Sequence, residues 1–321
     1  MRTAVLLPVW PERNVGRFTA LLEEGRKIWP HVGAEVRIGT DDWDVAAKTV
    51  AELRASGYVA VAHLPSIEQF RQEEGLKWLK GVRPDWAVVH GGTATDGEVK
   101  DCTDFVDFLR ERAARLRVLA ASGVPVFVEN APPREPVRDP SDSGTAAGVR
   151  PLVRAGMFAR DLLFLAGEAG CGVVADTEHL LDAIAAVREK AKWDGHLLLT
   201  PGERDFAGRF GFVVREGEVF WAGDYLYGLN LRGELSLLRA NRFHVTGSRA
   251  AVSGGAVTSH AEIRDDPFGR YLTRLVLSHR PLSVTVESCH EQGRFDFGVL
   301  KRSFLLVLRI LREWYPNPLK K

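Results

Sequence analysis

Short runs of apolar and β-branched residues recur along the chain, and each is followed by a longer segment in which apolar residues repeat with helical spacing. Most of these runs are apolar throughout, as expected of strands covered on both faces. The predicted strands span residues 3–9, 34–39, 58–63, 86–90, 124–129, 171–176, 242–246 and 282–287. The predicted helices span residues 16–28, 45–55, 67–80, 104–121, 153–168, 180–190, 234–240, 267–278 and 297–314.

Eight strands that alternate with helices predict an α/β protein, a closed (β/α)8 TIM barrel that forms a single domain over residues 1–321. The chain is longer than the usual barrel of about 250 residues, and two insertions explain the excess. A long loop at about 131–150, rich in Pro, Gly, Ser and charge, follows strand 5. A β-hairpin-like insertion at about 196–231 precedes strand 7. An open doubly wound sheet is disfavoured because the segment "LLPVWPERN" after the first strand lacks a glycine-rich phosphate loop.

Composition limits the partners of this protein. With 45% hydrophobic and 26% charged residues the chain is typical of a globular protein. Because 43 basic residues face 42 acidic ones, the net charge of +1 gives no global attraction for nucleic acid or an anionic membrane. Three scattered cysteines and the absence of a bilayer-length apolar stretch predict a cytoplasmic protein with no membrane contact, and nothing implies a protein partner.

Polar residues that can bind metal stand at the carboxyl ends of the predicted strands or just beyond them. In a barrel these ends meet at one mouth. An unpaired buried carboxylate costs several kcal/mol, and a divalent cation removes that cost. His and carboxylate ligands without thiolate suit Zn²⁺, Mn²⁺, Fe²⁺ or Co²⁺. The candidate ligands are too many for one ion and predict two or three: His63, His90, Glu129, Asp176, His179, His244, His260 and Glu287.

The order of these segments resembles the xylose-isomerase-like barrel superfamily, and within it most closely endonuclease IV, from about Tyr58 to Glu287. The step from Asp176 to His179, "DTEH", is similar to the family's Asp-x-x-His motif after strand 6, and "ENAP" is similar to its Glu-Asn segment after strand 5. The other segments are "VAHLP", "VVHGGT", "FHVTGS", "SHAEI" and "VTVES". The resemblance therefore implies a metal-dependent enzyme on a TIM barrel.

The resemblance also implies how the ligands divide between two or three Zn, Mn or Fe ions. One ion would be held by His63, His90 and Glu129. Glu129 would bridge to a second ion, whose remaining ligands would be Asp176, His244 and Glu287.

A third ion is implied at His179 and His260, but here the chain departs from the family. Endonuclease IV has an aspartate two residues before the last histidine, and this chain has Thr258. Because a threonine supplies no anionic oxygen, we expect weak or absent occupancy of this third site.

The first functional expectation is a phosphodiesterase of the endonuclease IV type, a hydrolase in which clustered ions activate water. Its substrate would be a phosphodiester, damaged DNA included. Glu129 and Glu287 would be the catalytic carboxylates, with Glu129 orienting the nucleophile. Four arginines on the loops after strands 5 and 7 are candidates for binding the substrate phosphates: Arg134, Arg138, Arg150 and Arg249.

The alternative is a sugar isomerase or epimerase of the same superfamily. In this reading Glu129, Asp176, His244 and Glu287 hold a single ion, while Glu129 and Glu287 move a proton at the carbon next to a carbonyl. His63 and His90 would then contact hydroxyl groups of a small sugar. A third reading is a barrel that has lost catalysis and only binds a ligand.

Overall fold

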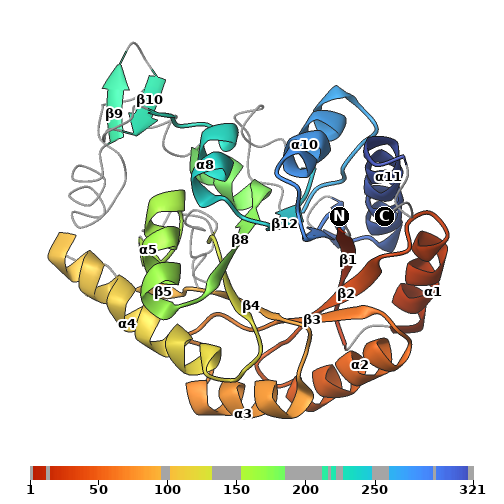
Figure 1. Ribbon diagram of the computed structural model, residues 1–321, viewed down its shortest axis with the longest axis horizontal. Coiled ribbons are helices and arrows are strands. Elements are labelled where there is room, and N and C mark those ends of the chain that lie inside the picture. Colours follow the sequence, from red (N-terminus) through yellow and green to blue (C-terminus); the bar gives the residue numbers. More distant parts are fainter. Residues whose placement is uncertain are drawn as a thin grey trace, which may run out of the picture.

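A computed structural model of the chain describes residues 3–11, 15–94, 102–131, 153–184, 212–215, 218–221, 227–247, 260–291 and 294–316. It confirms the predicted TIM barrel (Figure 1). Eight parallel strands close in the order β1-β13-β12-β8-β6-β4-β3-β2. Their bounds are β1 (Ala4–Val9), β2 (Val32–Arg37), β3 (Val59–His63), β4 (Ala87–His90), β6 (Val126–Glu129), β8 (Gly172–Asp176), β12 (Arg242–Val245) and β13 (Ser283–Val286).

Helices surround this barrel and cover the outer faces of its strands (Figure 1). Residues 177–184 are also helical and follow β8 directly. The other described helices are α1 (Val15–Arg26), α2 (Trp43–Ala55), α3 (Gln72–Val82), α4 (Cys102–Ala120), α5 (Ala159–Ala169), α8 (Leu231–Leu238), α10 (Pro267–Ser278) and α11 (Phe297–Trp314). None of the described helices has the length and apolar character needed to cross a bilayer.

The predicted helix at 67–80 begins later than expected, at Gln72. The backbone N–H of Ile67 donates to the carbonyl of His90 at 3.2 Å, which fixes this segment at the barrel rim. Arg71, directly before the helix, has an extended backbone (φ −78°, ψ 131°). The long-range bond to His90 thus replaces the first helical turn that the periodicity predicts.

The predicted helix at 153–168 is divided in two. The short strand β7 (Val153–Arg154) pairs with β5 (Thr93–Ala94), and α5 begins only after Phe158. Between them Gly156 has a φ of +83°, a left-handed conformation that glycine tolerates. The Asp161 carboxylate accepts the backbone N–H groups of residues 156, 157 and 158, and so caps the helix at that point.

The predicted insertion before strand 7 is confirmed as β-structure. Strands β9 (Phe212–Arg215) and β10 (Glu218–Trp221) pair antiparallel, and β11 (Tyr227–Gly228) pairs with β10. Helix α8 starts three residues before its predicted start because the Asn230 side chain accepts from the N–H of Gly233 at 2.9 Å. Residues 132–150, the predicted loop after strand 5, lie outside the described residues.

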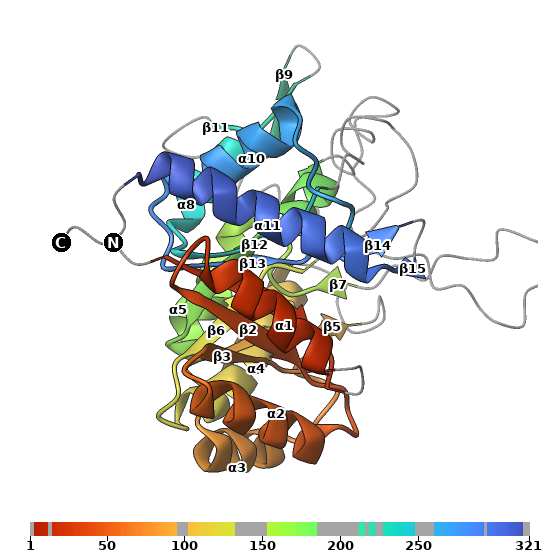
Figure 2. The same cartoon turned by 90° about the vertical axis from the view of Figure 1, so that its right-hand side faces the viewer.

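Successive side chains of each strand point alternately into and out of the barrel, and the inward ones fill its interior below the mouth. One layer consists of small and branched apolar side chains: Ala4, Leu6, Val61, Val88 and Val174. The Arg242 guanidinium lies over the rings of Phe127 and Trp86, at 3.9 and 4.7 Å from their centroids. The interior is therefore packed, and the polar side chains gather at the carboxyl ends of the strands. Figure 2 shows that end on its right-hand side, where β5, β7, β14 (His290–Glu291) and β15 (Arg294–Phe295) lie.

Candidate metal centre at the barrel mouth

Four of the predicted ligands form one buried cluster. Each offers one ligand atom, and these four atoms lie within 4.8 Å of one another. The side chains come from β6, β8, β12 and the residue after β13, so adjacent strands of the barrel bring them together. The cluster consists of Glu129, Asp176, His244 and Glu287. Three or four oxygen and nitrogen donors from the protein are typical of a divalent metal site.

His244 lies at the centre of this cluster. Its Nδ1 is 2.8 Å from Glu129 Oε1 and 2.9 Å from Glu287 Oε1. Its Nε2 is 2.9 Å from Glu35 Oε2. Burial lowers the pKa of this imidazole, but the negative charges of Glu129 and Glu35 outweigh burial and raise the pKa to about 10. In the metal-free protein His244 is therefore an imidazolium that stands in for the charge of an ion.

The orientation of Asp176 fits a cation. Its Oδ1 accepts the backbone N–H groups of Glu178 at 2.6 Å and of His179 at 2.9 Å. The Asn130 amide donates to the carbonyl of Asp176, and the N–H of Asp176 donates back to Asn130 Oδ1. Its other oxygen, Oδ2, is buried without a hydrogen-bond partner among the described residues. Burial also raises the pKa of Asp176. A divalent ion would stabilise this buried oxygen in its ionised form.

Glu129 is fully buried. Four histidines have a ring nitrogen within 4 Å of its carboxylate: His63, His90, His179 and His244. Burial disfavours its ionised form, but His244 and His90, with hydrogen bonds from His244 and His63, hold its pKa well below the usual range. Glu129 is thus an anion in the centre of the site. It is shared between two of the clusters that meet the spacing of a metal site.

The second predicted ligand set, His63, His90 and Glu129, also comes together within 4.8 Å. His63 Nδ1 lies 3.1 Å from the carbonyl oxygen of Leu64, and its Nε2 lies 2.9 Å from Glu129 Oε2. His90 Nε2 lies 3.6 Å from the same oxygen. Burial lowers the pKa of His63, and burial lowers that of His90 to about 3. Both rings are therefore neutral and able to ligate or hydrogen-bond.

The two histidines predicted for a third ion have separate surroundings. His179 Nδ1 donates to the carbonyl of Asn130 at 2.7 Å, whereas His260 Nδ1 lies 3.5 Å from Glu287 Oε2. Among the described residues, no group of three potential ligands within 4.8 Å includes either of them. The predicted substrate-binding arginines and the residue that departs from the family pattern lie outside the described residues: Arg134, Arg138, Arg150, Arg249 and Thr258.

Three charged residues of this site were not predicted. Glu35 and Arg37 face the barrel interior from β2, and Glu178 accepts the backbone N–H of His260 with both carboxylate oxygens, at 3.0 and 2.9 Å. Burial, followed by the charge of Asp176, raises the pKa of Glu178 to about 7. Glu35 was missed because it stands inside its strand rather than at the end. A carboxylate within the apolar run "VGAEVR" was the available signal.

A pocket of about 260 Å³ adjoins the cluster. Trp10 and Phe295 contribute an apolar wall, with ring centroids 5.2 Å apart in an edge-to-face arrangement. Glu287 lies at the boundary between the pocket and the metal cluster. Arg37, which also lines the pocket, pairs with Glu287. The remaining lining residues are Pro8, His260 and Cys289.

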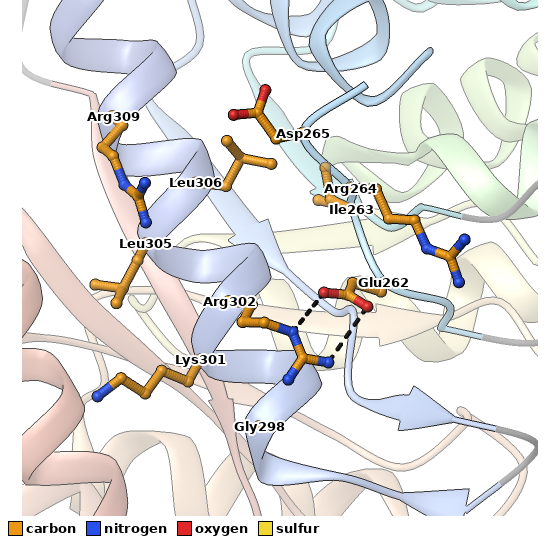
Figure 3. Close-up of a pocket in the computed structure, with 10 residues that line it drawn as sticks. All are labelled: Glu262, Ile263, Arg264, Asp265, Gly298, Lys301, Arg302, Leu305, Leu306 and Arg309. Carbon is orange, nitrogen blue, oxygen red and sulfur yellow. Dashed lines mark hydrogen bonds and ion pairs between the residues drawn. The ribbon is translucent and has the colours of Figure 1, made fainter. Parts of the chain in front are cut away.

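A second groove, of about 460 Å³, lies outside the mouth between α11 and residues 262–265 (Figure 3). One ion pair, between Arg302 and Glu262, joins its two sides. Arg302 Nε donates to Glu262 Oε1 at 2.6 Å and a second nitrogen of the same guanidinium lies 3.3 Å from Glu262 Oε2 (Figure 3). This groove contains none of the clustered histidines and carboxylates, so the chemistry is assigned to the barrel mouth.

The fold and the mouth cluster define a TIM barrel with a candidate metal centre. No protein-family model matches the chain, and no curated protein matches its sequence. In structure the chain is similar to a xylose isomerase domain protein from Planctomyces limnophilus, at 12% identity over 98% of both chains with a TM-score of 0.51. It is also similar to L-ribulose 3-epimerase (10% identity, 99% and 95% coverage, TM-score 0.48) and to D-psicose 3-epimerase (10% identity, 97% and 98% coverage, TM-score 0.45).

The likeness to the xylose isomerase domain protein agrees with the TIM-barrel fold. No comparison supports the predicted closeness to endonuclease IV, hydrolysis or a DNA substrate.

Proposed function

We propose that this protein is a divalent-metal-dependent isomerase or epimerase of a small sugar. The observation that carries the proposal is the pair of carboxylates, Glu129 and Glu287, that contact the same nitrogen of His244 at 2.8 and 2.9 Å within a four-ligand cluster. This cluster adjoins a pocket with aromatic walls. The similarity in fold to a xylose isomerase domain protein is consistent with this chemistry.

The four residues Glu129, Asp176, His244 and Glu287 would hold the ion. When bound, the ion supplies positive charge for the carbonyl oxygen of the substrate and for the enediolate that forms from it. One carboxylate accepts the proton from the carbon beside the carbonyl. The other returns a proton to the opposite face of that carbon, which epimerises it, or to the neighbouring carbon, which moves the carbonyl. In epimerisation one proton leaves the carbon and one is added. When the carbonyl moves, a second proton also passes from the hydroxyl oxygen to the former carbonyl oxygen, so neither reaction requires a redox partner.

The pocket explains how a sugar would be held. Trp10 and Phe295 offer apolar surface for the C–H face of a sugar, and such faces pack well on aromatic rings. Neutral His63 and His90 stand beside Glu129 and can bond to hydroxyl groups. Arg37 is paired with Glu35 and Glu287. These roles leave the four-ligand cluster complete without either histidine.

The second candidate function is the phosphodiesterase. The observation in its favour is the His63, His90 and Glu129 cluster, because two clusters that share one carboxylate match the layout of two-metal hydrolytic sites. Under this candidate two ions would bind, and both histidines would be ligands. It ranks second because the isomerase needs only the one four-ligand cluster. The similar structure with a TM-score of 0.51 is also a xylose isomerase domain protein.

The experiment that separates the two begins with protein stripped by EDTA and reloaded with Mn²⁺, Zn²⁺ or Co²⁺. Bound ions are counted by elemental analysis, and turnover is assayed on a panel of ketoses, an abasic-site DNA duplex and a generic phosphodiester. We expect one tightly bound ion and interconversion of a ketose. Glu129→Gln should abolish that turnover, whereas the matched surface change Glu313→Gln on α11 should preserve it. Two tight ions with phosphodiester cleavage and no ketose turnover would refute the isomerase.

A further inference from the structure

Glu35 is a buried carboxylate for which the proposed reaction has no role. It lies in the middle of β2, with 1% of its surface exposed, and faces the barrel interior. Interior positions of such barrels are usually filled by branched apolar side chains. A carboxylate at this place is costly unless all of its oxygens are paired. Its partners therefore indicate what it does.

The partners of Glu35 converge from three strands. Oε2 lies 2.9 Å from His244 Nε2 of β12 and accepts the hydroxyl of Thr285 of β13 at 2.9 Å. Oε1 lies 3.4 Å from the guanidinium of Arg37, two residues along β2. His63 is the remaining titratable neighbour, with a ligand atom within 4.8 Å of those of Glu35 and His244. The carboxylate is thus held through Oε2, which faces one nitrogen of His244, while Oε1 has the charge of Arg37 nearby but no hydrogen bond among the described residues.

The two nitrogens of His244 face different groups. Nδ1 faces Glu129 and Glu287, inside the four-ligand cluster, and Nε2 faces Glu35 outside it. A neutral imidazole has one N–H and one lone pair. With its N–H directed from Nε2 to Glu35, the lone pair of Nδ1 points into the cluster. Metal-ligating histidines are commonly fixed by a carboxylate in this way.

We infer that Glu35 is the positioning residue of the metal centre: it selects the tautomer and the ring orientation in which His244 presents Nδ1 to the ion. This inference rests on the proposed function only in that it uses the same four-ligand cluster. Thr285 of β13 and Arg37 of β2 contact Glu35 in turn. Residues of β2 and β13 therefore help to orient His244 of β12.

The test uses the full chain, stripped with EDTA and titrated with Co²⁺ against a chelating dye. Glu35→Gln keeps the shape of the side chain and removes its charge, so Co²⁺ affinity should fall by about 10- to 100-fold with an unchanged number of ions. In the Co²⁺-loaded wild type, His244 Nε2–H should give a paramagnetically shifted proton resonance that disappears in D₂O. His244→Gln identifies this signal by its loss, and Glu35→Gln should broaden it by faster exchange.

The matched control is Glu313→Gln, the same change at an exposed glutamate of α11 that pairs with Arg270, so Co²⁺ affinity should change by less than about threefold. A folded Glu35→Gln variant with wild-type affinity and an unchanged resonance would overturn the inference. So would the loss of one ion from the count, because Glu35 would then be a ligand. If Glu35→Gln does not fold, Glu35→Asp decides: it keeps the charge for Arg37 but withdraws it from Nε2, and wild-type affinity would again overturn the positioning role.

Failure of the proposed function gives a different result. Wild-type protein that binds Co²⁺ through His244 but turns over no ketose would refute the isomerase and leave the role of Glu35 to be decided by the affinities above. Wild-type protein that binds no Co²⁺ at all would overturn both.

Discussion

His244 has three carboxylates around one imidazole ring, those of Glu35, Glu129 and Glu287. In the metal-free protein the positive ring neutralises part of this charge, and in the loaded protein the ion would do so. Either of two cations, the His244 imidazolium or a metal ion, could therefore neutralise the three carboxylates. Stability and metal binding are thus coupled through a single side chain.

The first prediction concerns the pH dependence of the metal-free protein. The pKa of His244 is about 10 when folded against a usual value of 6.5, so its contribution is fully present below pH 6.5 and is lost as pH rises to 10. That contribution is of order 5 kcal/mol, since each pKa unit corresponds to about 1.4 kcal/mol. Urea unfolding between pH 6.5 and 10 measures it. A flat stability profile across this range would contradict the charge state of His244, and Mn²⁺-loaded protein serves as the control with a smaller slope.

The second prediction concerns His90, whose Nε2 lies 3.6 Å from Glu129 and outside the four-ligand cluster. Under the proposed function His90→Ala should retain its ion and raise KM for the sugar by up to about tenfold, the worth of one hydrogen bond. Metal analysis and steady-state kinetics measure both quantities. Loss of the ion together with turnover would instead place His90 among the ligands, as the phosphodiesterase requires.

At the residue scale, the sequence predicts site residues at the ends of strands better than site residues inside strands. Glu129, Asp176, His244 and Glu287 were predictable because each polar residue follows an apolar run, and parallel strands bring such ends to one mouth. Glu35 was not, because its importance depends on which strand lies opposite. The register that pairs β1 with both β2 and β13 brings Glu35 and Thr285 together from positions 250 residues apart.

Among the elements, the strands follow from the apolar runs and the helices depend on their ends. Six strands begin one or two residues inside their predicted ranges, and β2 begins two residues before its predicted start, at Val32. The helix at 67–80 and the helix at 153–168 were predicted too long at their amino ends. In both cases a long-range contact holds the predicted first turn outside the helix. Ile67 bonds to His90 in the first case, and β7 pairs with β5 in the second.

The third prediction tests such a helix end. Asp296 caps α11 by accepting the backbone N–H groups of Gly298 at 2.6 Å and Val299 at 3.0 Å. Asp296→Ala leaves these donors unpaired and should lower the free energy of unfolding by about 1 kcal/mol. Urea denaturation measures the change. Asp296→Asn keeps an acceptor and should lie close to wild type, so an equal loss in both variants would rule out capping as the cause.

For the whole molecule, ring closure depends on the first and last helices. β1 pairs with β13 to close the sheet, and α1 packs against α11 outside it. Gly25 of α1 allows this close approach, because a Cβ there would lie 2.5 Å from Phe304 Cε1 and 3.0 Å from Leu308 Cδ1 of α11. Phe304 is fully buried and has no free space to move into.

The fourth prediction compares two glycines in helices. Gly25→Ala should destabilise the protein by about 1–3 kcal/mol, because the added methyl group overpacks the contact between α1 and α11. Gly167→Ala on α5 meets nothing within 4 Å and should stabilise it by about 0.5–1 kcal/mol through helix propensity alone. Thermal and urea unfolding of the two variants measure both signs. Equal effects would show that the helix contact is not tightly packed.

The layer of Arg242, Trp86 and Phe127 below the site has a kinetic consequence. Among the described residues these side chains fill the barrel interior below the site, so a substrate would enter and a product would leave through the mouth. A product molecule in the pocket blocks the next substrate, and inhibition by product should be purely competitive. In the proposed interconversion of two sugars of equal size, the approach to equilibrium would then depend on how fast product leaves the pocket.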